Sequence, residues 1–267
     1  MSDWSLPKEE IIEARAFVDM FQAAPAFLAE TAGLAWMRAG EGCAVSLPPA
    51  PAMGLNRILA VRDLDDLERA YRWLGGRRGK RYVQIDEASA PAEVLLWLKE
   101  RGMEKQGNGW AKLTLPAAAV TLLPAGTVTA RLAGPDDAAL FAETMCRGFG
   151  FDHSLEPFWA GIVGKPGWNC FIAWLDDTPV ATGAMYVDDG YAWLGGGATI
   201  ADYRNKGAQA ALINARLAAG VSQGVSVFAV ETEQPEAGRE RGGTSYCNLQ
   251  KAGFRQVYTR QNFRLKD

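Results

Sequence analysis

The 267-residue chain is long enough to form two modest domains or one large one. Its composition, with 48% apolar and 22% charged residues, is ordinary for a well-packed globular protein. A net charge of −3 gives no reason to expect nucleic acid or an anionic membrane as a partner.

The cysteines also limit the classes of protein to consider. They are scattered without a C-x-x-C pair, at Cys43, Cys146, Cys170 and Cys247. Because His153 is the only histidine, a structural zinc site is not expected, and we predict no metal. Free thiols and no recognisable signal peptide fit a reducing cytoplasm, which is the predicted location. No apolar run approaches the roughly 18 residues that a membrane span needs.

In the first half, apolar periodicity and turn residues predict alternating helices and strands. Ser5 is the expected cap of a helix over 7–24, and Asp63 is the expected cap of a helix that ends at Leu74. Residues 25–33 extend the first helix or form another one. The other elements predicted here are strands at 34–37, 43–47, 56–62, 82–86 and 110–115 and a helix at 91–101.

The second half follows an apolar linker at 117–126, which we expect to pack against the protein. Its first part is predicted to contain strands at 128–132, 168–175 and 179–187 and helices at 135–146 and 157–162, with a connection at 148–157. Successive antiparallel strands with helices around them indicate a mixed α/β fold.

The stretch 191–222 carries the most informative motif of the chain. A glycine-rich strand at 191–200 leads into the turn Arg204-Asn205-Lys206-Gly207, and a helix with apolar residues at three- and four-residue spacing begins at Ala208. The unpaired amides at a helix start can hold phosphate oxygens, and the helix dipole and the two basic side chains favour an anion there. The sequence therefore predicts an anion site at this turn.

The segment 204–210, RNKGAQA, resembles the [Q/R]-x-x-G-x-[G/A] pyrophosphate loop of the GNAT superfamily of acyl-CoA-dependent N-acetyltransferases. Gln209 stands where that pattern usually has glycine or alanine. The context agrees with the family, since a second strand follows at 225–231 and the segment 245–254 resembles the late helix that ends in Gly-Phe. The resemblance covers residues 127–267.

The first half repeats the order of strands and helices of the second half. The echo is clearest where Leu98 to Met103 parallels Leu249 to Phe254. We therefore interpret the fold as an α/β tandem of GNAT-like domains with mixed (α+β-type) sheets. A degenerate domain at 1–122 precedes a complete acetyltransferase domain at 127–267. The phosphate turn of the first half is replaced by 61–66, which has three carboxylates and no glycine, and these charges would repel pyrophosphate. An unrelated α+β domain is the alternative for the first half.

The resemblance implies a transferase that moves an acetyl group from acetyl-CoA, its co-substrate, to the amine of a small molecule or peptide. From the net charge and the lack of a long apolar run we expect no nucleic acid or membrane partner, and we expect a monomer or homodimer. The alternative is a non-catalytic acyl-CoA-binding sensor or scaffold module. A nucleotide-binding dehydrogenase is not supported, because no G-x-G-x-x-G follows a strand.

The resemblance also implies how the co-substrate is held. Backbone amides of 205–210 would bind the pyrophosphate, and the pantetheine arm would lie along the end of the central strand. Gly195 to Gly197 would allow close approach and a bulge that separates the next strand, or they would simply pack under Trp193. The predicted cofactor-binding residues are Ala198, Thr199, Ile200, Arg204, Asn205, Lys206, Gly207, Ala208, Gln209, Ala210 and Asn248.

Acyl transfer to an amine requires that the amine lose a proton. Glu231, placed at the end of the strand after the loop helix, is the candidate base, acting directly or through a water with a pKa raised by burial. Glu233 is the alternative, as is a capping role for Glu231. The resemblance places the loop with Asp152, His153 and Glu156 at the border of the acceptor site.

The leaving thiolate needs an acid or must leave unaided. In the family a tyrosine commonly stands four residues before the glycine of the Gly-Phe pair, and here that position is Leu249. Ser245 lies one turn earlier on the same helical face, whereas Tyr246 is rotated away by about 100°. The sulfur is therefore expected to have the Ser245 hydroxyl, a water held by Ser245 or Asn248, or no protein acid at all, and Ser245 is the candidate acid.

Overall fold

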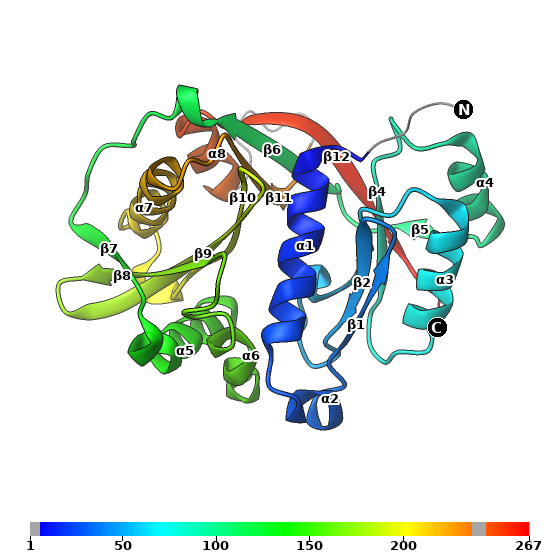
Figure 1. The fold of residues 1–267 in the computed structure, drawn as a ribbon, viewed down its shortest axis with the longest axis horizontal. Helices are drawn as coiled ribbons and strands as arrows, with labels where there is room; N and C mark the ends of the chain where they lie inside the picture. Colours follow the sequence, from blue (N-terminus) through cyan, green and yellow to red (C-terminus); the bar gives the residue numbers. More distant parts are fainter. Residues whose placement is uncertain (1–5, 237–243, 267) are drawn as a thin grey trace.

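The computed structural model describes residues 6–236 and 244–266, and Figure 1 shows its arrangement. Ser5, the expected cap of the first helix, lies outside the described residues. The α-helices are α1 (Lys8–Ala23), α2 (Phe27–Thr31), α3 (Leu64–Gly75), α4 (Ala92–Glu100), α5 (Ala138–Phe149), α6 (Glu156–Ala160), α7 (Ala208–Ser222) and α8 (Thr244–Lys251). Short 3₁₀ turns are η1 (Met53–Leu55), η2 (Ala117–Ala119), η3 (Pro135–Asp137), η4 (His153–Leu155) and η5 (Ala201–Tyr203).

The strands are β1 (Ala35–Ala39), β2 (Gly42–Ser46), β3 (Asn56–Leu59), β4 (Tyr82–Ile85), β5 (Glu104–Lys105), β6 (Trp110–Pro116), β7 (Val128–Leu132), β8 (Trp168–Leu175), β9 (Thr178–Asp188), β10 (Tyr191–Thr199), β11 (Val227–Glu233) and β12 (Arg255–Arg264). Asp63 caps α3 as predicted, because its carboxylate accepts a hydrogen bond from the Asp66 amide at 2.9 Å. Pro25 ends α1, since the residue before a proline is driven out of the helical conformation, so α2 is a separate helix. The prediction that Glu231 ends its strand is wrong, because β11 continues to Glu233.

The described strands form one continuous sheet in the order β1-β2-β3-β4-β12-β6-β11-β10-β9-β8-β7, with β5 paired to β12. The pairs β3–β4 and β10–β11 are parallel, whereas their neighbours are antiparallel. A mixed sheet between helices confirms the predicted α/β fold class.

The two halves exchange their last strands. In the first half the parallel pair β3–β4 is followed by β12, which comes from the end of the chain. In the second half the parallel pair β10–β11 is followed by β6, which comes from the first half. Figure 1 shows β6 and β12 running between the two sides of the molecule. The boundaries 1–122 and 127–267 stay a prediction, and the exchange means that each unit would include a strand of the other.

The register of the exchanged strands supports an internal repeat. Gln84 on β4 is opposite Asn262 on β12, and Glu231 on β11 is opposite Lys112 on β6. On β4 and on β11 alike, these residues come directly after the last residue that pairs with the parallel neighbour. An amide pair in one half therefore takes the place of a charged pair in the other.

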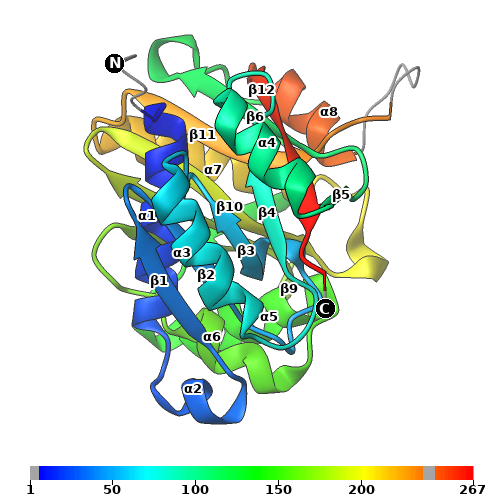
Figure 2. The same ribbon diagram turned by 90° about the vertical axis from the view of Figure 1, so that its right-hand side faces the viewer.

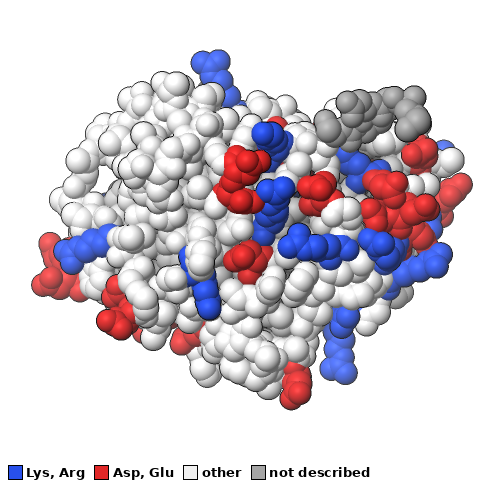
Figure 3. All heavy atoms as spheres, in the orientation of Figure 1, with Lys and Arg blue, Asp and Glu red and all other residues white. Residues whose placement is uncertain are grey.

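One apolar core joins the halves. The helices α1, α5 and α6 pack on the same side of the sheet, where the Phe21 and Phe158 rings meet edge to face at 5.1 Å. On the other face α3 and α4 cover the first-half strands (Figure 2), and α7 covers the second-half strands. In Figure 3 charged side chains gather over the first half, whereas the surface over α7 is largely uncharged. None of the described helices is both long and apolar enough to cross a membrane.

The linker packs as expected. Both backbone groups of Leu123 bond to the Asn214 side chain of α7, at 2.8 and 2.9 Å, and Val120 packs into the core beside α8. Leu122 between them is 53% exposed. This segment is therefore a site where a protease can reach the chain without entering the sheet.

We expect limited proteolysis near Leu122 to nick the chain without separating the halves. The strands β6 and β12 would continue to pair with their neighbours in both parts, so the fragments would elute together in native size-exclusion chromatography. A denaturing gel of the same peak would show two bands. Elution of two separate, folded fragments would contradict the strand exchange.

Candidate functional site

The sheet opens at the glycine-rich end of β10. Pairing between β10 and β11 stops at Leu194, and the register between β10 and β9 shifts between Gly195 and Ala198. The peptide groups of Gly196 and Gly197 consequently lie outside both ladders, and Gly196 has a φ of +58° that favours glycine. The predicted bulge is confirmed, and it lies where β10 and β11 stop pairing.

The sequence allows two roles for these glycines, packing under Trp193 and leaving room for a ligand, and each applies to a different residue. A side chain at Gly195 would collide with the ring of Trp193, whose nearest atom would lie 2.0 Å from the added carbon. At Gly197 the same addition would meet no atom within 4 Å. Trp193 therefore packs onto Gly195, whereas Gly197 is left open to a ligand.

A groove of about 660 Å³ runs from this bulge along the turn before α7. The turn contains two left-handed residues, Asn205 with φ of +62° and Gly207 with φ of +90°, and no side chain caps the first amides of α7. Arg204 and Lys251 line the groove, and none of its described lining residues is acidic. Uncapped amides, the positive end of the helix dipole and two cations make this a site for an anion.

Most of the predicted cofactor-binding residues line this groove. They are Ala198, Thr199, Arg204, Asn205, Gly207, Ala208, Gln209, Ala210 and Asn248. The structure does not bring Ile200 and Lys206 into it. Ile200 is buried and donates its amide to Val180, while the Lys206 ammonium lies 5.0 Å from the centre of the Tyr203 ring.

The corresponding turn of the first half lacks such a site. There Asp63 caps α3 with its own carboxylate, and Asp66 forms an ion pair with Arg69. The helix start is thus occupied by negative charge from the chain itself. This supports the prediction that the first half does not bind a pyrophosphate.

Sequence reasoning missed Arg216, whose side chain lines the groove although it projects from the middle of α7. Its guanidinium donates to the carbonyls of Leu212, Ala184 and Gly195 at 3.0, 3.3 and 3.3 Å. Among the described residues no carboxylate pairs with it, and burial lowers the pKa of Arg216 to about 10. The sequence holds one indication of this role, since Arg216 is the single charged residue of the 15-residue helix α7.

Arg216 explains how the opened strand is held. Where pairing between β10 and β11 stops, the Arg216 guanidinium donates to the carbonyl of Gly195. A cation is thereby fixed beside the bulge at Gly196 and Gly197. Gly148 at the end of α5 was also missed. A side chain there would lie 2.7 Å from Ala198, so α5 packs tightly on the end of β10.

A short chain of side-chain hydrogen bonds crosses from α8 to α7. The Asn248 amide donates to Gln209 at 2.7 Å, and the Gln209 amide donates to the Ser245 hydroxyl oxygen at 2.9 Å. Because this bond uses the acceptor side of the hydroxyl, its proton is free to point elsewhere. Tyr246 bonds instead to Gln256 at 2.7 Å and lines neither the groove nor the cavity described next.

A second cavity of about 300 Å³ adjoins the groove on the other side of the bulge. The two share Phe149, Gly197, Gln209, Arg216 and Ser245. Leu249 lies in the wall of the cavity and is buried, so it presents no proton donor there. A ligand in the groove and another in the cavity would therefore meet at Gly197 and Ser245.

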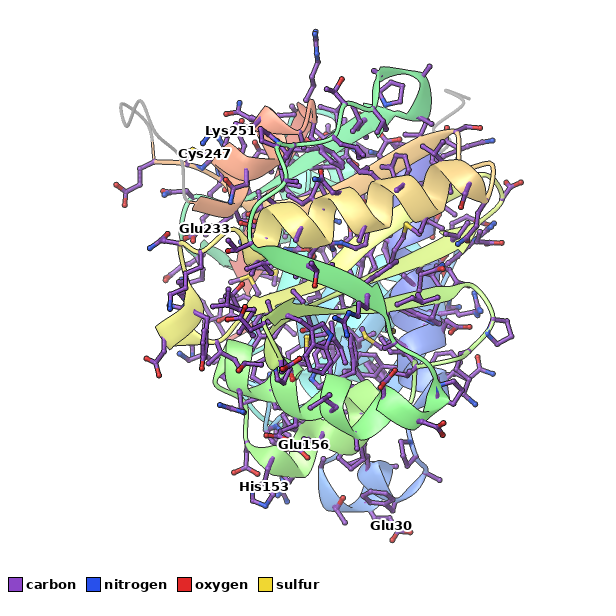
Figure 4. All side chains as sticks on the ribbon, turned by 90° about the vertical axis from the view of Figure 1, so that its left-hand side faces the viewer. Glu30, His153, Glu156, Glu233, Cys247 and Lys251 are labelled. Atoms are coloured by element: carbon purple, nitrogen blue, oxygen red, sulfur yellow. The ribbon has the colours of Figure 1, made fainter. Side chains whose placement is uncertain are left out.

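Glu231 lies at the buried wall of this cavity, with 7% of its side chain exposed. Its two oxygens accept from Arg57 at 2.7 and 2.9 Å, and Arg260 also donates to it. Burial raises the pKa of Glu231 from its ordinary value, although the Arg57 and Arg260 charges oppose the rise. Glu233, the alternative base, is labelled in Figure 4; it is exposed, and it also lines the cavity.

Glu231 belongs to a buried cluster of charges that joins the halves. Glu13 of α1 accepts from Arg57 at 2.7 Å, from Arg260 at 2.9 and 3.0 Å, and from Lys112. Glu10 accepts from Arg260 at 3.1 Å. In the interior of the described structure, the negative charges of these three carboxylates therefore balance the positive charges of Arg57, Lys112 and Arg260.

The polar residues of the loop after α5 do not reach the cavity, contrary to the expectation for the acceptor site. His153 and Asp152 have side chains 88% and 63% exposed, and Glu156 lines neither the groove nor the cavity. Figure 4 shows His153 and Glu156 near Glu30, at the opposite end of the molecule from Glu233 and Lys251. The wall in this region is instead formed by the aromatic residues Phe149, Phe151 and Trp159.

Comparison with known proteins agrees with this geometry. Residues 139–239 match the acetyltransferase (GNAT) family. The chain is similar to a GCN5-related N-acetyltransferase from Kribbella flavida, with 17% identity over 97% of this chain and 95% of that one and a TM-score of 0.60. A GCN5-related N-acetyltransferase from Sphaerobacter thermophilus shows 16% identity, coverage of 82% and 70%, and a TM-score of 0.57. No curated protein matches the chain.

The tandem arrangement also has a solved counterpart. A tandem GNAT protein from the clavulanic acid biosynthesis pathway shows 14% identity over 96% of this chain and 94% of that one, with a TM-score of 0.55. At such identities the likeness concerns the fold. The second half therefore carries a GNAT-family domain, and the chain as a whole has a tandem GNAT-like fold, as predicted.

Proposed function

We propose that this protein is an acyl-CoA-dependent N-acyltransferase that transfers an acetyl group from acetyl-CoA to an amine. A GNAT-family domain at 139–239 indicates an acyltransferase, and the finer assignment rests on one observation. An uncapped, basic helix start and a separate cavity meet at the bulge of β10. This arrangement supports our proposal that a pyrophosphate binds in one space and an acceptor in the other, joined where a reaction can occur.

The residues of the groove fit an acyl-CoA. The amides that begin α7 and the side chains of Arg204 and Lys251 would hold its phosphates, because they present donors and positive charge to one space. The open backbone at Ala198 and Thr199 would bind its arm. When bound, acyl-CoA supplies an acyl group activated as a thioester. The backbone amides of the bulge at Gly196 and Gly197, with Arg216 beside them, would stabilise negative charge on an acyl oxygen.

Two proton movements complete the transfer, in which a carbon–nitrogen bond forms and a carbon–sulfur bond breaks. Glu231 is our proposed base, because it is the buried carboxylate in the cavity wall and its oxygens keep lone pairs beyond those used by the arginines. Ser245, which lines both spaces, would donate the proton that the leaving sulfur takes up. A Glu231→Gln variant that binds acetyl-CoA and keeps full activity would contradict the role of Glu231.

Ser245→Ala is expected to lower kcat by about tenfold and no more than roughly 100-fold, since a thiolate with a pKa near 8.5 leaves tolerably unaided. Release of free thiol from acetyl-CoA in the presence of an amine measures this. Leu249→Tyr restores the side chain that the family commonly has and could raise the rate. Ser222→Ala, at the far end of α7, is the matched control. Loss of all activity in Tyr246→Phe would show that Tyr246 is the acid.

A binding module without turnover is the competing function. It is distinguished by the same assay, because a sensor or scaffold would bind acetyl-CoA and release no thiol with any amine. Turnover that depends on an added amine would support the enzyme.

A further inference from the structure

The cavity beside the bulge is built by both halves of the chain. The first half contributes Phe17 and Met20 from α1, Leu55 from η1 and Trp110 from β6. Helix α1 reaches the cavity because it lies across the centre of the molecule, between the first-half strands and β10 (Figure 1). The half that lacks a phosphate turn therefore forms one wall of the space next to the groove.

The second half contributes an aromatic wall, from the end of α5, the loop after it and α6. The rings of Phe149, Phe151 and Trp159 lie within 8° to 19° of parallel, with centres 5.1 to 6.3 Å apart. Phe149 is 43% exposed and Phe151 is half-buried, so part of their ring surface has no protein neighbour. Exposed aromatic surface facing a cavity is covered favourably by another flat apolar group.

Polar side chains are few in the cavity and several of them bond to protein groups, whereas the buried indole nitrogens of Trp159 and Trp193 have no partner among the described residues. Gln209 and Ser245 bond to each other, and Arg216 bonds to backbone carbonyls. The Arg57 guanidinium behind Glu231 is covered by the rings of Phe17 and Trp110, whose centres lie 4.5 and 5.6 Å away. An acceptor with many hydroxyl or ammonium groups would leave them unpaired here, at considerable cost.

The two carboxylates that line the cavity suit an acceptor that carries a single amine. Glu231 lies at the buried wall and Glu233 is exposed, and both line the cavity. A cationic amine can thus be attracted by one carboxylate and meet the other near the bulge. The volume of about 300 Å³ lies at the small end of ligand pockets, which limits the body attached to the amine.

On the basis of the proposed function, we infer that the acceptor is a primary amine on an aromatic or similarly sized apolar body. The apolar body stacks on the rings of Phe149, Phe151 and Trp159, and the first half forms another wall. The first half therefore serves acceptor selection although its own turn carries no phosphate site.

The test compares three amines with acetyl-CoA by release of free thiol: phenethylamine, ethylamine and spermidine. We expect kcat/KM for phenethylamine to exceed that for each of the others by about 30-fold or more, since only phenethylamine buries a ring. Phe151→Ala should lower this value about tenfold for phenethylamine and by no more than about twofold for ethylamine. Phe27→Ala, on the exposed surface of α2, should change neither value.

Two results would overturn the inference alone. Preference for spermidine or ethylamine would exclude an apolar acceptor while leaving the acyltransferase function standing. Equal effects of Phe151→Ala on phenethylamine and ethylamine would show that the rings do not select the acceptor. Binding of acetyl-CoA without thiol release for any amine would instead remove the proposed function, and the inference with it.

Discussion

Replacing Glu13 by glutamine is expected to lower the free energy of unfolding by about 3–5 kcal/mol, the range for breaking a buried ion pair. Glu13 is fully buried, and its carboxylate faces Arg57, Arg260 and Lys112. The isosteric amide keeps the volume and removes the charge, so the cluster is left with an unbalanced positive charge in the interior. Urea unfolding at pH 7 measures the change.

Glu30→Gln is the matched control. Glu30 lies on α2 and is exposed to solvent (Figure 4), so its replacement should change stability by less than about 0.5 kcal/mol. If Glu13→Gln and Glu30→Gln unfold at the same urea concentration, the buried cluster does not stabilise the junction between the halves.

The pH dependence gives a second measurement of the same cluster. Burial by itself raises the pKa of Glu13, but the charges of Arg260, Lys112 and Arg57 outweigh burial and hold it well below its ordinary value. Glu13 therefore contributes stability above the unfolded pKa of about 4.3, and this contribution is lost as the pH falls through the lower folded pKa. The stability of the wild-type protein should fall more steeply below about pH 4.5 than that of Glu13→Gln.

Gly207→Glu is expected to abolish measurable binding of CoA, a loss of at least about 100-fold. The added carboxylate would lie at the start of α7, where it repels phosphate and competes for the amides that should bind it. Losing two hydrogen bonds to a charged group is worth roughly 3–6 kcal/mol, which is enough for this effect. Isothermal titration with CoA measures both affinity and stoichiometry, and we expect one site per chain.

Gly224→Glu is a close control for this change. Gly224 also has a left-handed backbone, with φ of +76° against +90° at Gly207, and neither position has an atom within 4 Å of an added carbon. It follows the other end of α7, so the same strain and charge are placed away from the groove. A substitution at Asp65, in the first-half turn, should likewise leave the affinity unchanged. Binding of two CoA molecules per chain would contradict the prediction that the first half does not bind CoA.

The sequence determined the local structure and the family because these depend on neighbours within a few residues. The cap at Asp63, the break at Pro25 and the turn before Ala208 each follow from backbone chemistry that a short segment specifies. The family pattern at 204–210 could be recognised for the same reason. Gly195 to Gly197 signalled a bulge, and the bulge is where the sheet opens.

Only the tertiary structure decided how these elements combine. Alternation along β6 would by itself place Lys112 on a polar face, yet Lys112 is fully buried, because α1 covers that face and brings Glu13 to it. Glu231 and its partner Arg57 are 174 residues apart, and no local pattern predicts such a pair. Strand exchange, the role of Arg216 and the cavity shared by both halves depend on the same long-range packing, in which side chains distant in sequence decide which strands and helices become neighbours.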